Sequence, residues 1–466
     1  MRFRLSFFFG LLGFTINAQV FKVDTLQYNG NCKKFINMVF LGDGYTAAQQ
    51  DSFKLHVGEL QKSLFGQTPW KEYINYFNVF AVEVVSNESG AKHPNTAADC
   101  ANASPLVPVS DSDNYFGSTF DYGGAHRGIY AQNQAKIASV LAANFPQYDI
   151  AVMLVNSPYY GGFAKNFATL TRDKNSGELF AHEIGHSFGG LADEYWVSSF
   201  YAAEWPNMTA ETNNSLVRWN KWISSNGVGN YPFAQDPNWH KPHNTCKMQF
   251  LGKPYCSVCS EAIIEKIHEL MSPIVRYSPD SLQFQADHGA LYLKLDSLIR
   301  PVPNTLKTFW YLDGAVYTND PQADHIDIYP SQLANGQHTV GVGVLDTGLL
   351  LRSANHFTKH IYTITWKMEK VRSGIKLNGA PNEISYIVFP NPTQDELTIS
   401  VKMKSKENLE IVMYSLDGKR METITEKNLK TDYFNKTINL ATLAKGTYLL
   451  VINIDGKVLS EKVIKE

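Results

Sequence analysis

Two histidines and a glutamate stand close together in the stretch His182-Glu183-Ile184-Gly185-His186. On a helix, positions i and i+4 share one face, so His182 and His186 can present two imidazoles to one metal ion. Glu183 then reaches the open side of that ion, where it takes a proton from a bound water. Zinc suits imidazole and carboxylate ligands with one open position. The spacing therefore predicts zinc-dependent hydrolysis, with Glu183 as the general base.

A third metal ligand is expected shortly after the second histidine. Gly189 and Gly190 would end the helix, and Asp193 and Glu194 follow that turn. Zinc hydrolases commonly need a third protein ligand, and a carboxylate brought round by a glycine turn supplies one. We expect Asp193 to be this ligand, with Glu194 in reserve. Glu204 would serve only if a second helix carried the ligand.

The segments around this stretch predict a scaffold of helices covering a sheet. Short apolar runs bounded by turn residues indicate buried strands, and apolar residues at helical spacing indicate helices. Their alternation is typical of a mixed α/β domain, which we expect to span residues 19–271. The expected strands are 36–41, 77–85 and 148–155, and the expected helices are 47–64 and 132–144.

The remainder of the chain has a different pattern, in which short strands are separated by turn residues. Residues 272–370 predict a small Ig-like β-sandwich, which is as consistent with a passive spacer as with a binding module. Residues 371–381 are rich in Gly, Asn and Pro and predict a linker, and 382–466 predict a second all-β domain. The expected fold is therefore multidomain: an α/β (α+β) catalytic domain followed by two small all-β sandwich domains.

The N-terminus has the features of an export signal. A basic start at Met1 to Arg4 precedes an apolar run from Leu5 to Phe14, and Ala18 offers a small residue for cleavage. That run is shorter than the ~20 apolar residues that cross a bilayer. We expect residues 1–18 to be a signal peptide. No later segment reaches spanning length, so no integral membrane segment is expected in the mature protein.

Charge and cysteine content narrow the function further. The formal net charge of −2 gives no electrostatic reason to expect nucleic acid as a partner. Outside the cytoplasm cysteines can oxidise, and Cys246, Cys256 and Cys259 are close enough in sequence to predict a local disulfide. A structural zinc knuckle usually needs a second pair of cysteines, so we favour the disulfide.

Three segments together resemble the immunoglobulin A peptidase-type metallopeptidases, which are secreted bacterial metzincins. They are Val39 to Tyr45, His182 to Tyr195, and Cys246 to Met248 followed by Cys256 to Ala262. The resemblance implies a metzincin-like zinc endopeptidase with His182, His186 and Asp193 as ligands and Glu183 as base. It also implies a methionine beneath the metal, for which Met248 is the candidate. It does not carry over immunoglobulin A as the substrate.

The chain departs from the metzincin pattern in one place. There the third ligand falls six residues after the second histidine, and Ala192 occupies that position in this sequence. Asp193 lies one residue later, and the second glycine, Gly190, accounts for the difference. Before the helix, Tyr159 to Gly162 could form an edge that pairs with an extended substrate backbone, or simply a turn.

The C-terminal domain resembles the sorting domains recognised by the Por, or type IX, secretion system. The matching residues include Phe389 to Pro392, Tyr414 to Gly418, Leu443 to Tyr448 and Lys462 to Lys465. The resemblance implies export through the periplasm and outer membrane, followed by release or attachment to the cell surface. A carbohydrate-binding or adhesive sandwich is the alternative.

We therefore expect a secreted zinc endopeptidase that acts on protein or peptide substrates, engages the type IX machinery and is a monomer. The alternative is a non-enzymatic surface adhesin or glycan-binding protein with an inactive peptidase-like domain. An enzyme for glycoproteins or cell-wall peptides would use the same chemistry on a different substrate. The presence of all the catalytic groups favours the enzyme.

Overall fold

The computed structural model describes residues 19–102, 105–285, 290–370, 385–402, 407–427, 429 and 433–466. The expected signal peptide and linker lie outside the described residues. The chain forms two compact units. The first comprises Met1–Met271, Pro301–Pro303 and Leu349–His356, and the second comprises Ser272–Arg300, Asn304–Gly348 and Phe357–Glu466.

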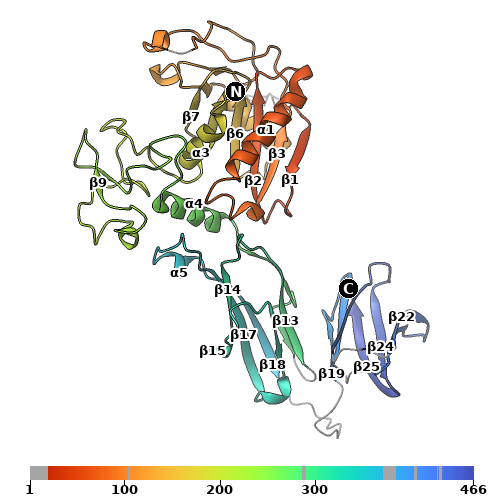
Figure 1. Cartoon of the computed structure of the whole chain (residues 1–466). Helices are drawn as coiled ribbons and strands as arrows, with labels where there is room; N and C mark the ends of the chain where they lie inside the picture. Colours follow the sequence, from red (N-terminus) through yellow and green to blue (C-terminus); the bar gives the residue numbers. More distant parts are fainter. Residues whose placement is uncertain are drawn as a thin grey trace, which may run out of the picture. The chain divides into compact units, whose positions relative to one another are not determined.

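A six-stranded sheet forms the centre of the first unit, in the order β1-β3-β2-β6-β8-β7 (Figure 1). The four inner strands are parallel, and each edge strand is antiparallel to its neighbour. Parallel strands covered on both faces carry nearly continuous apolar runs, as the sequences of β2 and β6 do. The strands are β1 (Val23–Gln27), β2 (Ile36–Asp43), β3 (Phe77–Val82), β6 (Ile150–Val155), β7 (Gly162–Ala164) and β8 (Ala168–Thr171).

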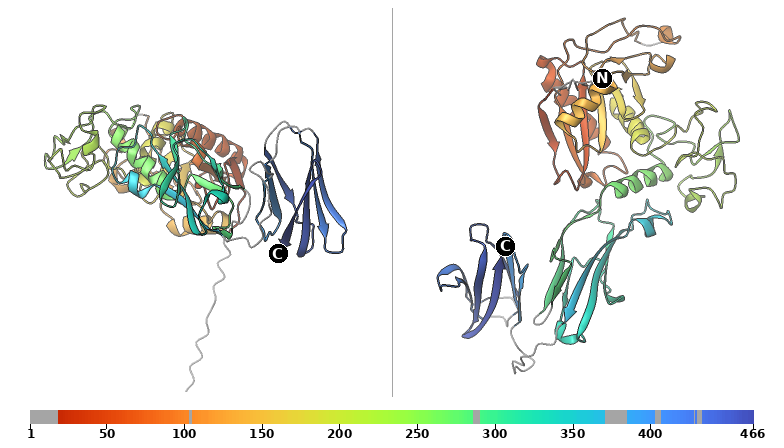
Figure 2. Two further views of the ribbon diagram at one scale, coloured as in Figure 1. Left: turned by 90° about the horizontal axis from the view of Figure 1, so that it is seen from below. Right: turned by 180° about the vertical axis from the view of Figure 1, so that it is seen from behind.

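Helices cover both faces of this sheet. On one face, α1 (Gln50–Leu64) packs against α3 (Ser176–Ser187), and Phe40 of β2 meets Phe180 of α3 with ring centroids 5.5 Å apart. On the other face, α2 (Gln134–Asn144) shares a buried core with the alternate β2 residues Val39 and Leu41 (Figure 2). The predicted mixed α/β character is confirmed.

The ends of the predicted elements differ slightly from the structure. The helix expected from residue 47 begins as a 3-10 turn (Ala47–Gln49) and becomes α1 only at Gln50. The first unit also contains α4 (Ser257–Leu270) and four two-residue strands. These strands are β4 (Ser118–Thr119), β5 (Tyr130–Ala131), β9 (Tyr231–Pro232) and β10 (His240–Lys241).

Asp43, at the carboxyl end of β2, ties a long loop to the sheet. Its side chain is fully buried. It accepts hydrogen bonds from the backbone N–H groups of Gly44, Phe116 and Ser118 at 3.0–3.1 Å and from the Ser86 hydroxyl at 3.3 Å. Burial raises the pKa of this carboxyl, and the N–H groups pointing at it counteract that effect. The Gly42-Asp43-Gly44 turn therefore positions the loop that later forms one wall of the cleft.

We expect Asp43→Asn to lower the free energy of unfolding by about 2–4 kcal/mol, because an amide N–H₂ would face donors that need an acceptor. The change is measured by urea unfolding. Asp51→Asn is the matched control, since its side chain is 97% exposed, and it should change stability by less than about 0.5 kcal/mol. Equal losses in the two variants would contradict this role for Asp43.

The second unit contains two β-sandwiches. In the first, the sheets β11-β13-β16 and β12-β18-β17-β14-β15 enclose Leu293, Trp310 and Trp366. Its elements are β11 (Ile274–Ser278), β12 (Gln283–Gln285), β13 (Leu291–Leu298), β14 (Leu306–Leu312), β15 (Ala315–Thr318), β16 (His325–Ile328), β17 (Gly336–Asp346) and β18 (Tyr362–Lys370), with the short helix α5 (His356–Lys359) before β18.

The second sandwich pairs the sheet β19-β20-β23 with the sheet β22-β21-β24-β25. Their inward residues, among them Leu397, Ile411 and Leu450, form one buried core. Apolar and polar residues alternate strictly in β20, and buried residues alternate with more exposed ones in β24, as is typical of strands with one solvated face. The strands are β19 (Ser385–Phe389), β20 (Glu396–Lys402), β21 (Leu409–Ser415), β22 (Arg420–Glu426), β23 (Tyr433–Asn439), β24 (Gly446–Ile454) and β25 (Lys457–Lys465).

Candidate metal centre and cleft

Helix α3 holds the two predicted histidine ligands one turn apart. Leu179, Phe180 and Ile184 bury one side of the helix against the sheet, which fixes the direction in which His182 and His186 point. The helix ends at Ser187, and Gly190 adopts the left-handed conformation with φ of 60°. A glycine takes this conformation without the steric penalty that a side chain brings. The chain therefore turns back towards the histidines, as the sequence predicted.

Both imidazoles are oriented by backbone carbonyl groups. The Nδ1 atom of His182 lies 3.1 Å from the carbonyl oxygen of Lys247, and that of His186 lies 2.7 Å from the carbonyl oxygen of Leu191. A carbonyl oxygen only accepts, so each Nδ1 carries the hydrogen and each Nε2 carries a lone pair. Such bonds are the usual way in which metal-binding histidines are held.

The free Nε2 atoms converge on Asp193. They lie 3.2 Å from each other, and Asp193 Oδ1 is 3.2 Å from Nε2 of His182 and 3.3 Å from that of His186. Asp193 Oδ1 is buried and, within the described part of the chain, has no hydrogen-bond partner. When both rings are neutral, three lone-pair donors therefore face one another with no proton between them. A metal cation bound between these atoms would accept all three lone pairs, so the arrangement fits a metal site.

The electrostatics of the site also favour a positive charge. Burial opposes protonation of His186, but its contact with Asp193 and the charge of that carboxylate raise the pKa of His186 to about 9. Burial alone would raise the pKa of Asp193, yet the two imidazoles hold it well below its usual range. A proton on His186 balances Asp193 in the same way that a cation would.

The two other carboxylates considered as ligands lie elsewhere. Glu194 is fully buried and turned towards Cys259 and Asn207, whose Sγ and Nδ2 atoms lie 3.1 and 3.2 Å from its Oε1. Glu204 accepts hydrogen bonds from the Thr209 hydroxyl and the Ala210 N–H. The structure thus places Asp193, and neither Glu194 nor Glu204, beside the histidines.

Met248 lies beneath the two histidines. Its side chain is fully buried, and a Cβ placed on Gly185 would be 2.7 Å from its sulfur. A side chain at position 185 would therefore require Met248 to move. The Met248 carbonyl also accepts a 2.8 Å hydrogen bond from the N–H of Glu194, which joins the methionine segment to the loop that carries Asp193.

A cleft of about 780 Å³ opens over this centre. Its lining includes His182, Glu183, His186 and Asp193. Burial raises the pKa of Glu183, and the adjacent imidazoles counteract part of that effect. One wall is the edge strand β7 with Tyr160, and another is the loop from Tyr122 to Gly128, which brings in Arg127. Extended chains bind beside sheet edges of this kind.

Comparison with known families identifies the segment that contains this centre. Residues 25–237 match the IgA Peptidase M64 family. The candidate metal centre lies inside this M64 segment. Residues 387–466 match the secretion system C-terminal sorting domain. This domain indicates type IX secretion to the cell surface or exterior.

Other comparisons add little. No curated protein gives a significant match to the chain. A Parabacteroides merdae beta-glucuronidase structure shares 7% identity over 49% of this chain and 28% of its own, with a TM-score of 0.18. The chicken interferon gamma receptor alpha chain shares 10% identity over 41% of this chain and 100% of its own, with a TM-score of 0.15. Structural similarity this weak gives no information about the fold or function of the M64 segment. This chain spans 28% of the glucuronidase's length.

The arrangement of the cysteines contradicts the predicted local disulfide. All five are unbridged, and the Sγ atoms of Cys246 and Cys259 are 3.6 Å apart, far beyond the ~2.05 Å of a disulfide. The predicted local bridge is therefore wrong for this structure. Instead Cys246, Cys256 and Cys259 gather around Glu194, and backbone N–H groups approach two of the sulfurs at 3.3 and 3.5 Å. The sequence could not show that a carboxylate joins them.

Several residues of the cleft were missed because no local pattern marks them. Arg127 and Tyr195 line the cleft, and Tyr201 accepts a 3.0 Å hydrogen bond from the N–H of Asp193 through its hydroxyl. Each lies in a loop without helical or strand periodicity. The aromatic density just after Asp193 was the one available signal.

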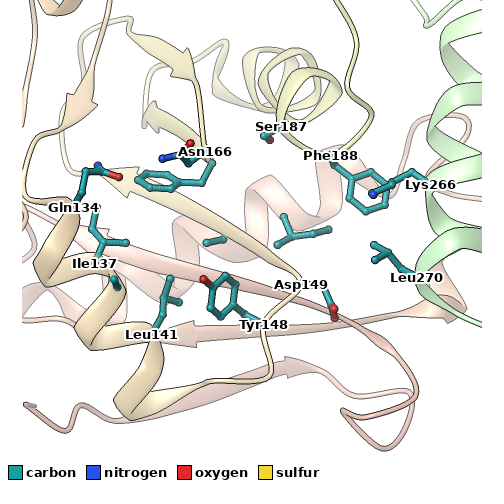
Figure 3. Close-up of a pocket in the computed structure, with 14 residues that line it drawn as sticks. Gln134, Ile137, Leu141, Tyr148, Asp149, Asn166, Ser187, Phe188, Lys266 and Leu270 are labelled. Carbon is teal, nitrogen blue, oxygen red and sulfur yellow. The ribbon is translucent and has the colours of Figure 1, made fainter. Parts of the chain in front are cut away.

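A second cavity of about 370 Å³ lies away from the metal centre, between α2, β6 and α4 (Figure 3). Its lining includes Ile137, Leu141 and Phe167 and only two charged residues, Asp149 and Lys266. No histidine or cysteine is among the residues that line it. Among the residues that the structure describes, no helix is long and apolar enough to cross a membrane.

Proposed function

We propose that this chain is a secreted zinc-dependent endopeptidase with a metzincin-like catalytic domain. The observation that carries the proposal is the convergence of three lone-pair donors from His182, His186 and Asp193, with Asp193 Oδ1 buried and without a hydrogen-bond partner among the described residues. Nitrogen and oxygen donors of this kind suit zinc. We propose these three residues as its ligands.

When bound, zinc would act as a Lewis acid and make a water molecule acidic enough to attack a peptide carbonyl near neutral pH. Glu183 supplies the base for that attack. Its carboxylate lies against the edge strand, since a Cβ on Gly162 would be 2.9 Å from Glu183 Oε1. A peptide laid along β7 would therefore have its backbone beside this carboxylate. Glu183 accepts the proton of the attacking water and later delivers it to the leaving nitrogen.

The cleft also supports an extended substrate. Gly162 to Ala164 form the outermost strand of the sheet and line the cleft, so a peptide can pair with them through main-chain hydrogen bonds. The Gly162 N–H already donates to the Arg127 carbonyl at 3.1 Å, which holds the two walls together. Main-chain pairing places few demands on side chains, which is consistent with protein or peptide substrates in general.

We further propose the division of the chain that the sequence predicted. Residues 1–18 would be a signal peptide, 19–271 the zinc peptidase, 272–370 an Ig-like sandwich and 371–381 a linker, with the sorting domain filling 382–466. The mature peptidase would act as a monomer. The non-enzymatic adhesin finds no support in the family match, which describes a peptidase.

The proposal is tested with the purified full chain and casein or gelatin as substrate. Prolonged chelation should remove hydrolysis, and added zinc should restore it, because the donor set needs its cation. Mass spectrometry of the fragments should show internal cuts. Inhibitors of serine and cysteine peptidases serve as controls and should have no effect. Hydrolysis by protein that is free of metal would refute the zinc mechanism, and binding without any hydrolysis would favour the adhesin.

A further inference from the structure

Four side chains of different chemistry meet in the first unit, away from the catalytic histidines. His93, Cys100, Asp121 and His126 are all buried, with exposures of 1, 7, 8 and 6%. One nitrogen, sulfur or oxygen atom of each lies within 4.8 Å of those of the others. They come from one long loop between β3 and α2. Nothing in the catalytic mechanism uses them.

The spacing of these atoms is that of a tetrahedral ligand shell. Asp121 Oδ1 lies 3.2 Å from Nδ1 of His126, 3.5 Å from Nε2 of His93 and 3.2 Å from Sγ of Cys100. The sulfur lies 3.7 Å from Nε2 of His93. Typical zinc bond lengths place neighbouring tetrahedral ligands about 3.2–3.8 Å apart. The catalytic donors of this same chain are separated by 3.2–3.3 Å.

Hydrogen bonding shows that His93 directs a lone pair into the cluster. Its Nδ1 lies 3.0 Å from the carbonyl oxygen of Pro108, which can only accept, so Nδ1 carries the hydrogen. In the neutral ring Nε2 is then unprotonated and faces the Asp121 carboxylate. Two lone pairs at this distance repel each other unless a cation lies between them. His182 and His186 are oriented by the same kind of bond.

The remaining groups are held by outer contacts. The other oxygen of Asp121, Oδ2, accepts a 2.7 Å hydrogen bond from the N–H of Thr96. The N–H of His126 donates to Asp99 at 2.8 Å, and the N–H and carbonyl of His93 pair with those of Ser110. The bond to Asp121 is an outer-shell bond to a ligand group, as in built metal sites, and the backbone bonds hold the chain on either side of the cluster.

We propose that His93, Cys100, Asp121 and His126 bind a second, structural zinc ion. One thiolate, one carboxylate and two neutral imidazoles neutralise a divalent ion, so the buried cluster carries no net charge. Sulfur and nitrogen donors together favour zinc over magnesium or calcium. All four positions are occupied by protein, as in structural rather than catalytic zinc sites.

An explanation by ion pairs alone fits less well. Asp121 would then pair with two protonated histidines while the Cys100 thiol donates a hydrogen bond to it, which would leave one excess positive charge buried. The other buried group, in which Glu194 meets three cysteines, suits a divalent ion less well. Full ionisation of its four ligands would leave a net charge of −2 on the bound site.

The proposed zinc would shape the catalytic cleft. Asp121 and His126 flank the turn at 122–125, and Tyr122, Ala125 and Arg127 of this loop line the cleft. Backbone hydrogen bonds of 3.0–3.4 Å also close this turn, and the longest of them include the 3.4 Å bond from the Asp121 N–H to the His126 carbonyl. A metal crosslink would fix the wall that faces Glu183, and its loss would loosen that wall.

Metal content of the full chain, measured by elemental analysis and native mass spectrometry after zinc loading and dialysis, tests the site. Cys100→Ser and Asp121→Asn should each lower bound zinc by about one equivalent relative to wild type. Cys32→Ser removes a thiol outside both buried groups and should lower it by none. His182→Ala with His186→Ala should remove a different equivalent, and adding Cys100→Ser to that pair should remove both.

The outcomes separate this proposal from the catalytic one. If Cys100→Ser and Asp121→Asn retain the metal content of wild type, the second site does not exist, whatever happens at His182. If the His182→Ala, His186→Ala variant binds no zinc at all, the proposal also fails. If Cys100→Ser does not fold, the His182→Ala, His186→Ala variant still tests the proposal. Its four-residue cluster is intact, so it should retain one zinc ion.

Hydrogen exchange gives a readout independent of activity. Chelation of wild-type protein should raise amide exchange several-fold in peptides covering residues 105–131, because the crosslink that closes the loop is removed. In Asp121→Asn the same peptides should exchange fast before chelation and change little on chelation. If neither chelation nor the Asp121→Asn substitution changes amide exchange in these peptides, the proposed structural role of the ion is refuted.

Discussion

Glu183→Ala should lower kcat/KM on casein by about 10²–10⁴-fold, the usual contribution of a positioned general base, while bound zinc is unchanged. Glu183 is 7% exposed and lines the cleft, but the converging donors are His182, His186 and Asp193. Removal of its carboxylate therefore removes the proton acceptor and leaves the metal ligands in place. Steady-state kinetics and elemental analysis on the same sample measure both quantities.

Glu204→Gln is the matched control for this variant. Glu204 is an acidic residue of the same unit whose oxygens are occupied by Thr209 and Ala210, so its neutralisation should leave kcat/KM within about twofold of wild type, as is usual for surface changes. Retention of casein hydrolysis by Glu183→Ala would remove Glu183 as the base. Loss of zinc along with activity would instead make it a ligand.

Asp193→Ala should weaken binding of the catalytic zinc by more than about 100-fold, which is beyond the 10–100-fold effect of outer-shell partners. The reason is that Asp193 Oδ1 is the only carboxylate oxygen described within 3.3 Å of both Nε2 atoms. Activity should fall with zinc content and recover in part when excess zinc is added. A competition titration with a chelator measures the affinity.

Glu194→Gln is the informative comparison, because Glu194 is adjacent in sequence and fully buried. Its contacts are with Cys259 and Asn207, so the amide should keep the catalytic zinc and affect mainly stability. A buried group that loses a good partner costs about 1–3 kcal/mol. If Glu194→Gln abolished catalytic zinc and Asp193→Ala retained it, the ligand assignment would move by one residue.

The sequence predicted the framework well because the framework depends on local patterns. The strand of residues 36–41, the helix of 132–144 and the face shared by His182 and His186 all follow from periodicity within one element. The glycine turn was visible for the same reason, since Gly190 adopts a conformation that few other residues reach easily.

What the sequence left open depends on contacts between distant segments. Arg127 reaches the cleft because the loop before α2 is anchored on Asp43, which lies at the end of β2. His93 and His126 meet because that loop folds back on itself, and no short motif records this. The cysteines were assigned to a bridge because Glu194, far from them in the sequence, was not known to lie among them.

The packing of Met248 under the histidines has a consequence for a peptidase that works outside the cell, where peroxides attack thioethers. Oxidation to the sulfoxide adds a polar oxygen to the sulfur, and this sulfur lies where even a single methyl group on Gly185 would be 2.7 Å away. On the side that faces Gly185, an added oxygen would require neighbouring atoms to move. Because Met248 is fully buried, the fold shields this sulfur, whose oxidation would disturb the packing against the helix that carries both histidines.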